Sequence, residues 1–362
     1  MRIVSLLPSA TEILCALGLA DQVVGISHAC DYPARITNRP RLTRSVLRED
    51  LASGEIHRRV QESAAGRARL YELDGDLLAR LQPDLIVTQD QCSVCAVGKS
   101  DVDDAVTFNG CDARVVVLRA TRFREVMDDI LMVGSATGRE EAAGALTARM
   151  RVRLEDVRRG IAQARRPRVL CLSWFDPLMA ASHWMTDIVE CAGGVDDLGA
   201  GNRGSTPLEP GRLVSYDPET IVLMPCDFGL ERTMREWRKP AVQGLCGGLN
   251  AVRNGRVYAV KGSLFHRPGP RLVDGVELLA GVLHPLRVRH DHSREAEQGL
   301  LFAHQLEAEG LPKAQAGLSI QHGQERQEQI QSQTAGSPAE HSGHESKLEE
   351  SRSLDPHQRQ QI

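Results

Sequence analysis

The chain has 362 residues, of which 41% are hydrophobic and 25% charged, and its formal net charge is −4. This composition is typical of a globular protein large enough for two domains, and the slightly negative charge excludes a general attraction to nucleic-acid backbones. No run of eighteen apolar residues occurs and the printed N-terminus lacks a signal-peptide pattern, so we expect no membrane insertion and a cytosolic location.

Strand and helix patterns alternate over residues 1–121. Ile3–Leu7 is predicted as a strand, and the helix after it is expected to begin with a capping box made by Ser9 and Glu12 and to end at Gly18. The runs VVGIS, DLIVT and RVVVL follow as strands, and their β-branched residues on both faces indicate cover on both sides. The sequence therefore predicts an N-terminal α/β lobe.

The pattern becomes helical over residues 122–166. Its second half, between Gly138 and Pro167, is long enough for roughly 40 Å of helix at 1.5 Å per residue. Such a helix can join two lobes as a stiff strut, or it can lie on the surface of one large domain. The residues alone leave both readings open.

A second alternation of strands and helices covers residues 167–285. The stretches QPDLIVTQDQC and DPETIVLMPCD share a proline, an acidic residue, Ile-Val and a cysteine beyond the strand, which predicts two similar α/β lobes. Residues 286–362 are rich in Gln, Glu, Ser and His, so we expect a mostly disordered tail with a short helix near residues 299–309.

The candidate site lies in the loops that follow the predicted strands, because ligands of parallel α/β sheets bind beyond the carboxyl ends of the strands. Aromatic residues make up only 4% of the chain, so their clusters in these loops suggest a flat ligand gripped by ring faces. A neutral imidazole there could ligate a metal ion. The candidate ligand-binding residues are Pro8, Ser9, Ala10, Thr11, His28, Tyr32, Gln89, Gln91, Cys92, Cys95, Trp174, Phe175, Asp176, His183, Trp184, Cys226, Asp227, Phe228, Phe265 and His266.

Cys92 and Cys95 form a C-x-x-C motif directly behind a predicted strand, and three readings stay open. A redox pair needs its first cysteine at a helix N-terminus, and Gly98 interrupts the segment behind this one. A metal site needs further ligands, which Cys30 and His28 would supply if the two strand ends are neighbours. In the third reading the two thiols line the ligand cleft.

Several motifs together carry a family resemblance. SLLPSATEIL, SHACDYP, QDQCSVCA, WFDPLMAASHWMTDIVECAGG and IVLMPCDFGLERT, in this order, resemble the cobalamin-type substrate-binding proteins of ABC importers, within the helical-backbone group of periplasmic binding proteins. The resemblance runs from Met1 to about Pro285. It implies a class III fold with two Rossmann-like lobes joined by a long backbone helix, with the ligand held between the lobes and little hinge motion.

The resemblance also suggests a ligand and a partner. It implies cobalamin first, with haem or ferric siderophores as related ligands, no cofactor of the protein's own, and a monomer that docks on an ABC permease. No G-x-S-x-G, P-loop, H-E-x-x-H or dinucleotide fingerprint occurs, which favours binding over catalysis. Three functions stay open: extracytoplasmic delivery to an importer, a cytosolic corrinoid or haem carrier, and a cytosolic metal or redox protein that uses Cys92 and Cys95.

Overall fold

The computed structural model describes residues 1–48, 50–90, 99–108, 112–199, 204–288 and 301–302. All of them belong to one compact unit, Met1–Glu309. Within the described residues, no helix combines the length and hydrophobicity needed to cross a bilayer. Most of the tail predicted over residues 286–362 lies outside the described residues.

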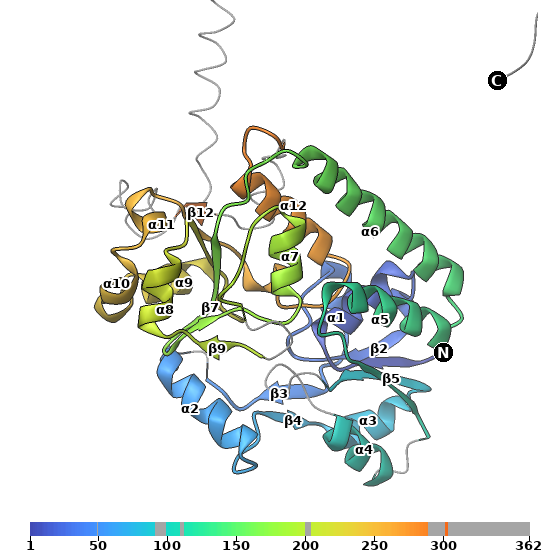
Figure 1. The fold of residues 1–362 in the computed structure, drawn as a ribbon. Helices are drawn as coiled ribbons and strands as arrows, with labels where there is room; N and C mark the ends of the chain where they lie inside the picture. Colours follow the sequence, from blue (N-terminus) through green and yellow to red (C-terminus); the bar gives the residue numbers. More distant parts are fainter. Residues whose placement is uncertain (49, 91–98, 109–111, 200–203, 289–300, 303–362) are drawn as a thin grey trace, which may run out of the picture. The chain divides into compact units, whose positions relative to one another are not determined.

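The first sheet is entirely parallel and lies in the N-terminal, blue to teal part of Figure 1. Its central strands are buried. Apolar side chains alternate to both faces of these strands, so helices must cover both faces, as the β-branched runs predicted. In spatial order its strands are β2 (Val23–Ile26), β1 (Ile3–Ser5), β5 (Leu85–Gln89) and β6 (Arg114–Leu118). A small antiparallel pair, β3 (Thr43–Ser45) and β4 (Tyr71–Leu73), accompanies it.

The second sheet has a parallel centre and antiparallel edges. Its strands, in spatial order, are β12 (Leu301–Phe302), β11 (Val257–Ala259), β10 (Thr220–Leu223), β7 (Val169–Phe175), β8 (Leu178–Ala180) and β9 (Thr206–Pro207). Strand β12 pairs antiparallel with β11, so the helix predicted near residues 299–309 is wrong at Leu301 and Phe302. Pairing with an open sheet edge satisfies backbone groups that the short amphipathic pattern assigned to a helix.

Two helices connect the sheets, α5 (Phe123–Ala136) and α6 (Glu140–Gly160). Their closeness depends on Gly134, where an added Cβ would lie 2.5 Å from the Cβ of Ala143. The 21 residues of α6 correspond to about 31 Å of helix. The long helix predicted between Gly138 and Pro167 is therefore confirmed, although it ends at Gly160 and is shorter than the roughly 40 Å expected. The α/β class with a helical backbone between two sheets is confirmed as well.

The remaining helices cover the sheets and bury three hydrophobic clusters. The largest cluster runs from the first sheet through α5 and α6 to the helices behind the second sheet, and nearly every residue of α12 is buried in it. These helices are α1 (Pro8–Ala16), α2 (Ser53–Ala64), α3 (Gly75–Leu81), α4 (Lys99–Phe108), α7 (Met185–Cys191), α8 (Pro210–Tyr216), α9 (Leu230–Trp237), α10 (Pro240–Cys246), α11 (Asn250–Arg253) and α12 (Leu272–Leu283).

The capping box predicted for the first helix is wrong. Helix α1 starts at Pro8, its N-cap is Leu7, and no side chain accepts a hydrogen bond at this end. Proline at the first helical position lacks the N–H that a cap would satisfy. Glu12, expected to reach back to the helix start, is buried and accepts hydrogen bonds from Arg271 instead.

Candidate functional site

A cluster of charged residues joins the loops at the ends of β1, β2 and β11. The guanidinium of Arg271 donates two hydrogen bonds to the carboxylate of Glu12, with Nε 2.9 Å from Oε2 and Nη2 2.5 Å from Oε1. Arg267 pairs with Asp31 and reaches Glu12 at 3.5 Å. Glu12 lies on α1, Asp31 lies in the loop after β2, and the two arginines lie just before α12. These four residues, the Glu12 ion cluster, therefore join the elements of the two sheets.

The environment favours the charged forms of Arg267 and Asp31. The side chain of Glu12 is 2% exposed and that of Arg267 is 10% exposed. Burial lowers the pKa of Arg267, but the hydrogen bond to Asp31 and the nearby carboxylates outweigh it and raise the pKa above its usual value. Burial likewise acts to raise the pKa of Asp31, and the hydrogen bond and charge of Arg267 bring it below its usual value. A buried charge is tolerated when it is paired and hydrogen-bonded in this way.

A second connection joins the start of α2 to β7 and α9. The backbone carbonyl of Ser53 accepts a hydrogen bond from the indole Nε1 of Trp174 at 3.1 Å, and its hydroxyl donates to Oε2 of Glu236 at 2.8 Å. Gly54 lies so close to the carboxylate of Asp176 that an added Cβ would collide with it. We call these residues the Ser53 contact. It brings Trp174 and Asp176, both predicted site residues, against the first residues of α2.

His28 follows β2 and interacts with residues associated with both sheets. Its Nδ1 lies 2.7 Å from Oγ1 of Thr43, and its ring centroid is 5.4 Å from that of Tyr71. Burial lowers the pKa of His28, while the carboxylate of Asp227, beyond β10 of the second sheet, opposes that shift. The net effect favours a neutral imidazole, the form that ligates metals.

His183 follows β8 and has an unusual environment. Its ring stacks on that of Trp184, with centroids 5.7 Å apart. Burial, and to a lesser degree the charge of His266, lowers the pKa of His183. Its Nδ1 is buried without a hydrogen-bond partner among the described residues. An imidazole nitrogen with no internal partner is suited to meet a ligand.

Two of the predicted site residues have a strained backbone. His183 and Asp227 both have φ of +57°, a conformation that is uncommon for residues other than glycine. The other described non-glycine residues with positive φ, Gln82 and Asp217, are C-caps of α3 and α8, where a left-handed residue is normal. Strain outside a helix cap is often associated with function, so the two loops at the ends of β8 and β10 are candidates for ligand contact.

Several predicted site residues lie in the hydrophobic core. The indole N–H of Trp184 donates to the backbone carbonyl of Phe265 at 2.7 Å, and Trp184 is 7% exposed. Thr11 contacts Cys30 inside the first sheet's core. Phe228 packs against Trp174, with ring centroids 5.0 Å apart. The buried members of the predicted set are Ser9, Ala10, Thr11, Gln89, Phe175, Trp184, Phe228 and Phe265, whereas Pro8, His28, Tyr32, Trp174, Asp176, His183, Cys226, Asp227 and His266 are partly or well exposed.

The predicted metal site is only half described. Cys92 and Cys95 lie outside the described residues, as does Gln91. Among the residues that are described, no group of three or more His, Cys, Asp or Glu side chains is arranged to hold a metal ion. Burial raises the pKa of Cys30, which opposes the thiolate form that metals require.

Sequence reasoning missed the two connections between the sheets. Glu12, Arg267, Arg271 and Ser53 were not among the candidate residues. Arg267 and Arg271 stand four residues apart in RPGPR, before the last helix, and this pair of positive charges was a sequence signal for a charged contact. It could not be paired with Glu12, which is more than 250 residues away in the sequence.

Comparison with known proteins places the chain among transport proteins. A family profile described as periplasmic binding protein matches residues 3–264. An ABC transporter substrate-binding lipoprotein of Bacillus subtilis is 28% identical over 294 residues, covering 78% of this chain and 80% of the relative. A vitamin B12-binding protein of Vibrio cholerae is 23% identical over 282 residues, covering 76% of this chain and 86% of the relative.

A solved structure supports the fold. The periplasmic heme binding protein of Pseudomonas aeruginosa superposes with a TM-score of 0.61 at 19% identity, covering 79% of this chain and 93% of that one. This likeness confirms the predicted arrangement of two sheets and a backbone helix. The profile match includes the loops that carry His28, His183 and Asp227.

Proposed function

Because the chain belongs to the periplasmic binding protein family, we propose that it binds a corrinoid such as cobalamin, or a related metal chelate, between its two sheets and delivers it to an ABC importer. Names of relatives that bind vitamin B12 and haem support this ligand class. We propose no catalytic step, since the family consists of transporter components. The division into lobes at residues 1–121 and 167–285, joined by residues 122–166, follows the two sheets and belongs to the same proposal.

The observation that carries the proposal is the pair of imidazoles at the strand ends of both sheets. Burial lowers the pKa of His28 and of His183, so both rings are neutral at physiological pH. His183 is the better candidate for an axial contact to cobalt or iron, because its side chain is partly exposed and its buried Nδ1 has no hydrogen-bond partner among the described residues to hold the ring in place. Trp174, which is partly exposed at the end of β7, supplies a ring face from the second sheet.

Titration of the purified protein tests this function. Cyanocobalamin, cobinamide and haem are each titrated by absorbance and by calorimetry. We expect at least one of them to bind one to one with a Kd below about 1 μM, or about −8 kcal/mol. Failure of all three to bind at about 10 μM would remove the proposal.

Two histidine variants separate a metal contact from a general effect. His183→Ala is expected to weaken the binding of cobinamide or haem, which offer open axial positions, and to shift the visible absorbance bands of the bound ligand. The matched control is His57→Ala on α2. The side chain of His57 has no hydrogen bond or ring contact within the described part of the chain. Equal losses in both variants, or unchanged spectra in both, would contradict the role of His183.

The proposed role also requires a location outside the cytoplasmic membrane. The names of the relatives, a lipoprotein and a periplasmic protein, support that location and not the cytosolic one expected from the printed N-terminus. Protease treatment of intact spheroplasts tests it, because an extracytoplasmic protein is degraded while cytosolic markers survive. Light scattering of the purified protein, with and without cobalamin, tests the predicted monomer.

A further inference from the structure

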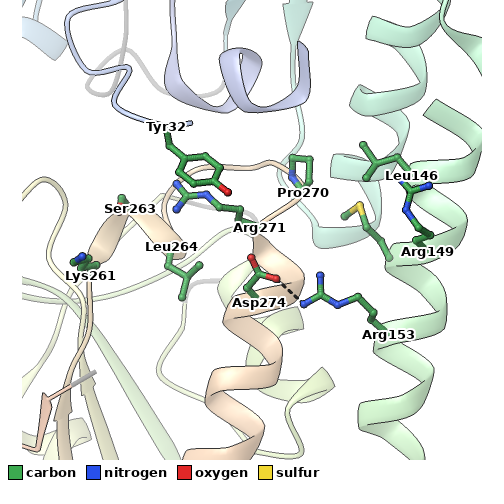
Figure 2. A pocket seen from close by; sticks show the side chains of 11 residues that line it. Tyr32, Leu146, Arg149, Arg153, Lys261, Ser263, Leu264, Pro270, Arg271 and Asp274 are labelled. Carbon is green, nitrogen blue, oxygen red and sulfur yellow. Dashed lines mark hydrogen bonds and ion pairs between the residues drawn. The ribbon is translucent and has the colours of Figure 1, made fainter. Parts of the chain in front are cut away.

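A pocket of about 590 Å³ lies behind the Glu12 ion cluster, between the backbone helix α6 and the start of α12 (Figure 2). Its volume is within the range of small-molecule sites. Figure 2 shows Tyr32 lying over Arg271, and Arg153 extending from α6 toward Asp274. The lining residues are Tyr32, Leu146, Arg149, Met150, Arg153, Lys261, Ser263, Leu264, Pro270, Arg271 and Asp274.

One wall of the pocket is a continuous face of α6. Leu146, Arg149, Met150 and Arg153 are spaced at positions i, i+3, i+4 and i+7, so they lie on the same side of the helix. None of them belongs to the strand-end loops that form the proposed chelate site. The α6 wall is therefore separate from the proposed chelate site, whereas Tyr32 after β2 and Lys261 and Leu264 after β11 line the pocket from strand-end loops.

The lining of the pocket carries excess positive charge. Four lining residues are cationic and one, Asp274, is acidic. Arg153 is paired with both Asp274 and Glu277, and Arg271 is paired with Glu12. Arg149 is exposed and has no hydrogen-bond or ion-pair partner in the described part of the chain. A cation left over after the internal pairs are formed is available for an external anion.

The pocket also offers surface for an apolar body. The ring of Tyr32 is 47% exposed and lies 4.2 Å from the guanidinium of Arg271, which fixes its orientation. Leu264 and Met150 add apolar groups on opposite walls. A ligand that combines a charged end with a flat or apolar body would contact both kinds of surface at once.

We propose that this pocket is a second binding site, for a small organic phosphate or carboxylate with an aromatic body. Arg149 contacts the anionic group from α6, and Lys261 contributes positive charge from the opposite wall. Tyr32 packs against the aromatic body. The proposal does not depend on a bound chelate, because its anion contact, Arg149, lies on α6 and not in the strand-end loops.

Phenyl phosphate is the probe, titrated by calorimetry into the full chain at about 0.15 M salt to suppress weak surface binding. We expect it to bind at least tenfold more tightly than inorganic phosphate, which lacks the ring, and than phenol, which lacks the charge. Absence of phenyl phosphate binding at millimolar concentration overturns the proposal. Equal affinity for phenyl phosphate and inorganic phosphate overturns the role of Tyr32 and the apolar wall.

A matched pair of variants on α6 locates the site. Arg149→Ala is expected to weaken the binding of phenyl phosphate at least tenfold. Arg151→Ala removes an exposed arginine two residues away, on a different face of the same helix and outside the pocket lining, and is expected to leave the affinity unchanged. Both arginines are exposed, so both variants are expected to fold. Equal losses in the two variants indicate nonspecific charge attraction and overturn the proposal.

Discussion

Glu12→Gln removes one negative charge from the carboxylate that Arg267 and Arg271 contact across the two sheets. The three side chains are 2%, 10% and 22% exposed, so water can replace little of the lost interaction. Removing one partner of a buried ion pair typically costs about 3 to 5 kcal/mol, because the remaining charge is left uncompensated. Glutamine keeps one oxygen acceptor and Arg267 keeps Asp31, so we expect a loss of about 2 to 3 kcal/mol in the free energy of unfolding.

Urea unfolding at pH 7 measures this loss. With a slope of about 2 to 3 kcal/mol per molar urea, the midpoint is expected to fall by about 1 M. The matched control is Glu62→Gln, since Glu62 also pairs with an arginine, Arg58, but on the exposed face of α2. Exposed pairs contribute little, so the control is expected to unfold at the wild-type midpoint.

A double variant tests whether the cost comes from the unpaired charge. Glu12→Leu combined with Arg271→Met replaces the ion pair by apolar side chains of similar length, and is expected to recover much of the stability lost in Glu12→Gln. The reasoning is refuted if Glu12→Gln unfolds at the same midpoint as Glu62→Gln. In that case the Glu12 ion cluster does not stabilise the connection between the sheets.

Two further predictions concern buried polar groups. Burial raises the pKa of Asp196 to about 6, so the folded state retains its proton longer than the unfolded state and loses stability as pH rises from about 4 to 6. Asp196→Asn is therefore expected to be about 1 to 3 kcal/mol more stable than wild type at pH 7 and similar to wild type at pH 4. Urea unfolding at both pH values measures this difference. A variant that is less stable than wild type at pH 7 contradicts the prediction. Ser53→Ala removes the hydroxyl that donates to Glu236. We expect it to lower the free energy of unfolding by about 1 kcal/mol, because Lys239 still pairs with that carboxylate. A loss of about 3 kcal/mol or more in urea unfolding would show that Lys239 does not compensate.

Periodic patterns predicted the parts of the fold that depend on local sequence. The β-branched runs located the parallel strands, and the uninterrupted helical pattern after Gly138 located α6. These predictions succeed because burial on both faces of a strand, or along one face of a helix, imposes a period on the sequence itself. The family resemblance rested on motifs in a fixed order and was equally accessible.

Features that depend on distant partners could not be predicted. The Ser9 and Glu12 spacing fits a capping box, but a buried arginine from the start of α12 competes for the carboxylate and forms the stronger, charge-assisted bond. Trp184 illustrates the same limit for aromatic clusters. Its position beside His183 suggests a ligand contact, whereas its indole N–H is bound to a backbone carbonyl 81 residues away. A sequence pattern does not say which side of an aromatic ring faces the core.

The two connections between the sheets differ in strength and in place. The Glu12 ion cluster shares Arg271 with the pocket beside α6, so it lies next to the backbone helix. The Ser53 contact joins the start of α2 to β7 and α9, and consists mainly of single hydrogen bonds. A typical hydrogen bond contributes about 1 kcal/mol, whereas removing one partner of a buried ion pair costs about 3 kcal/mol or more, so substitutions in the Glu12 ion cluster are expected to cost more stability than substitutions in the Ser53 contact.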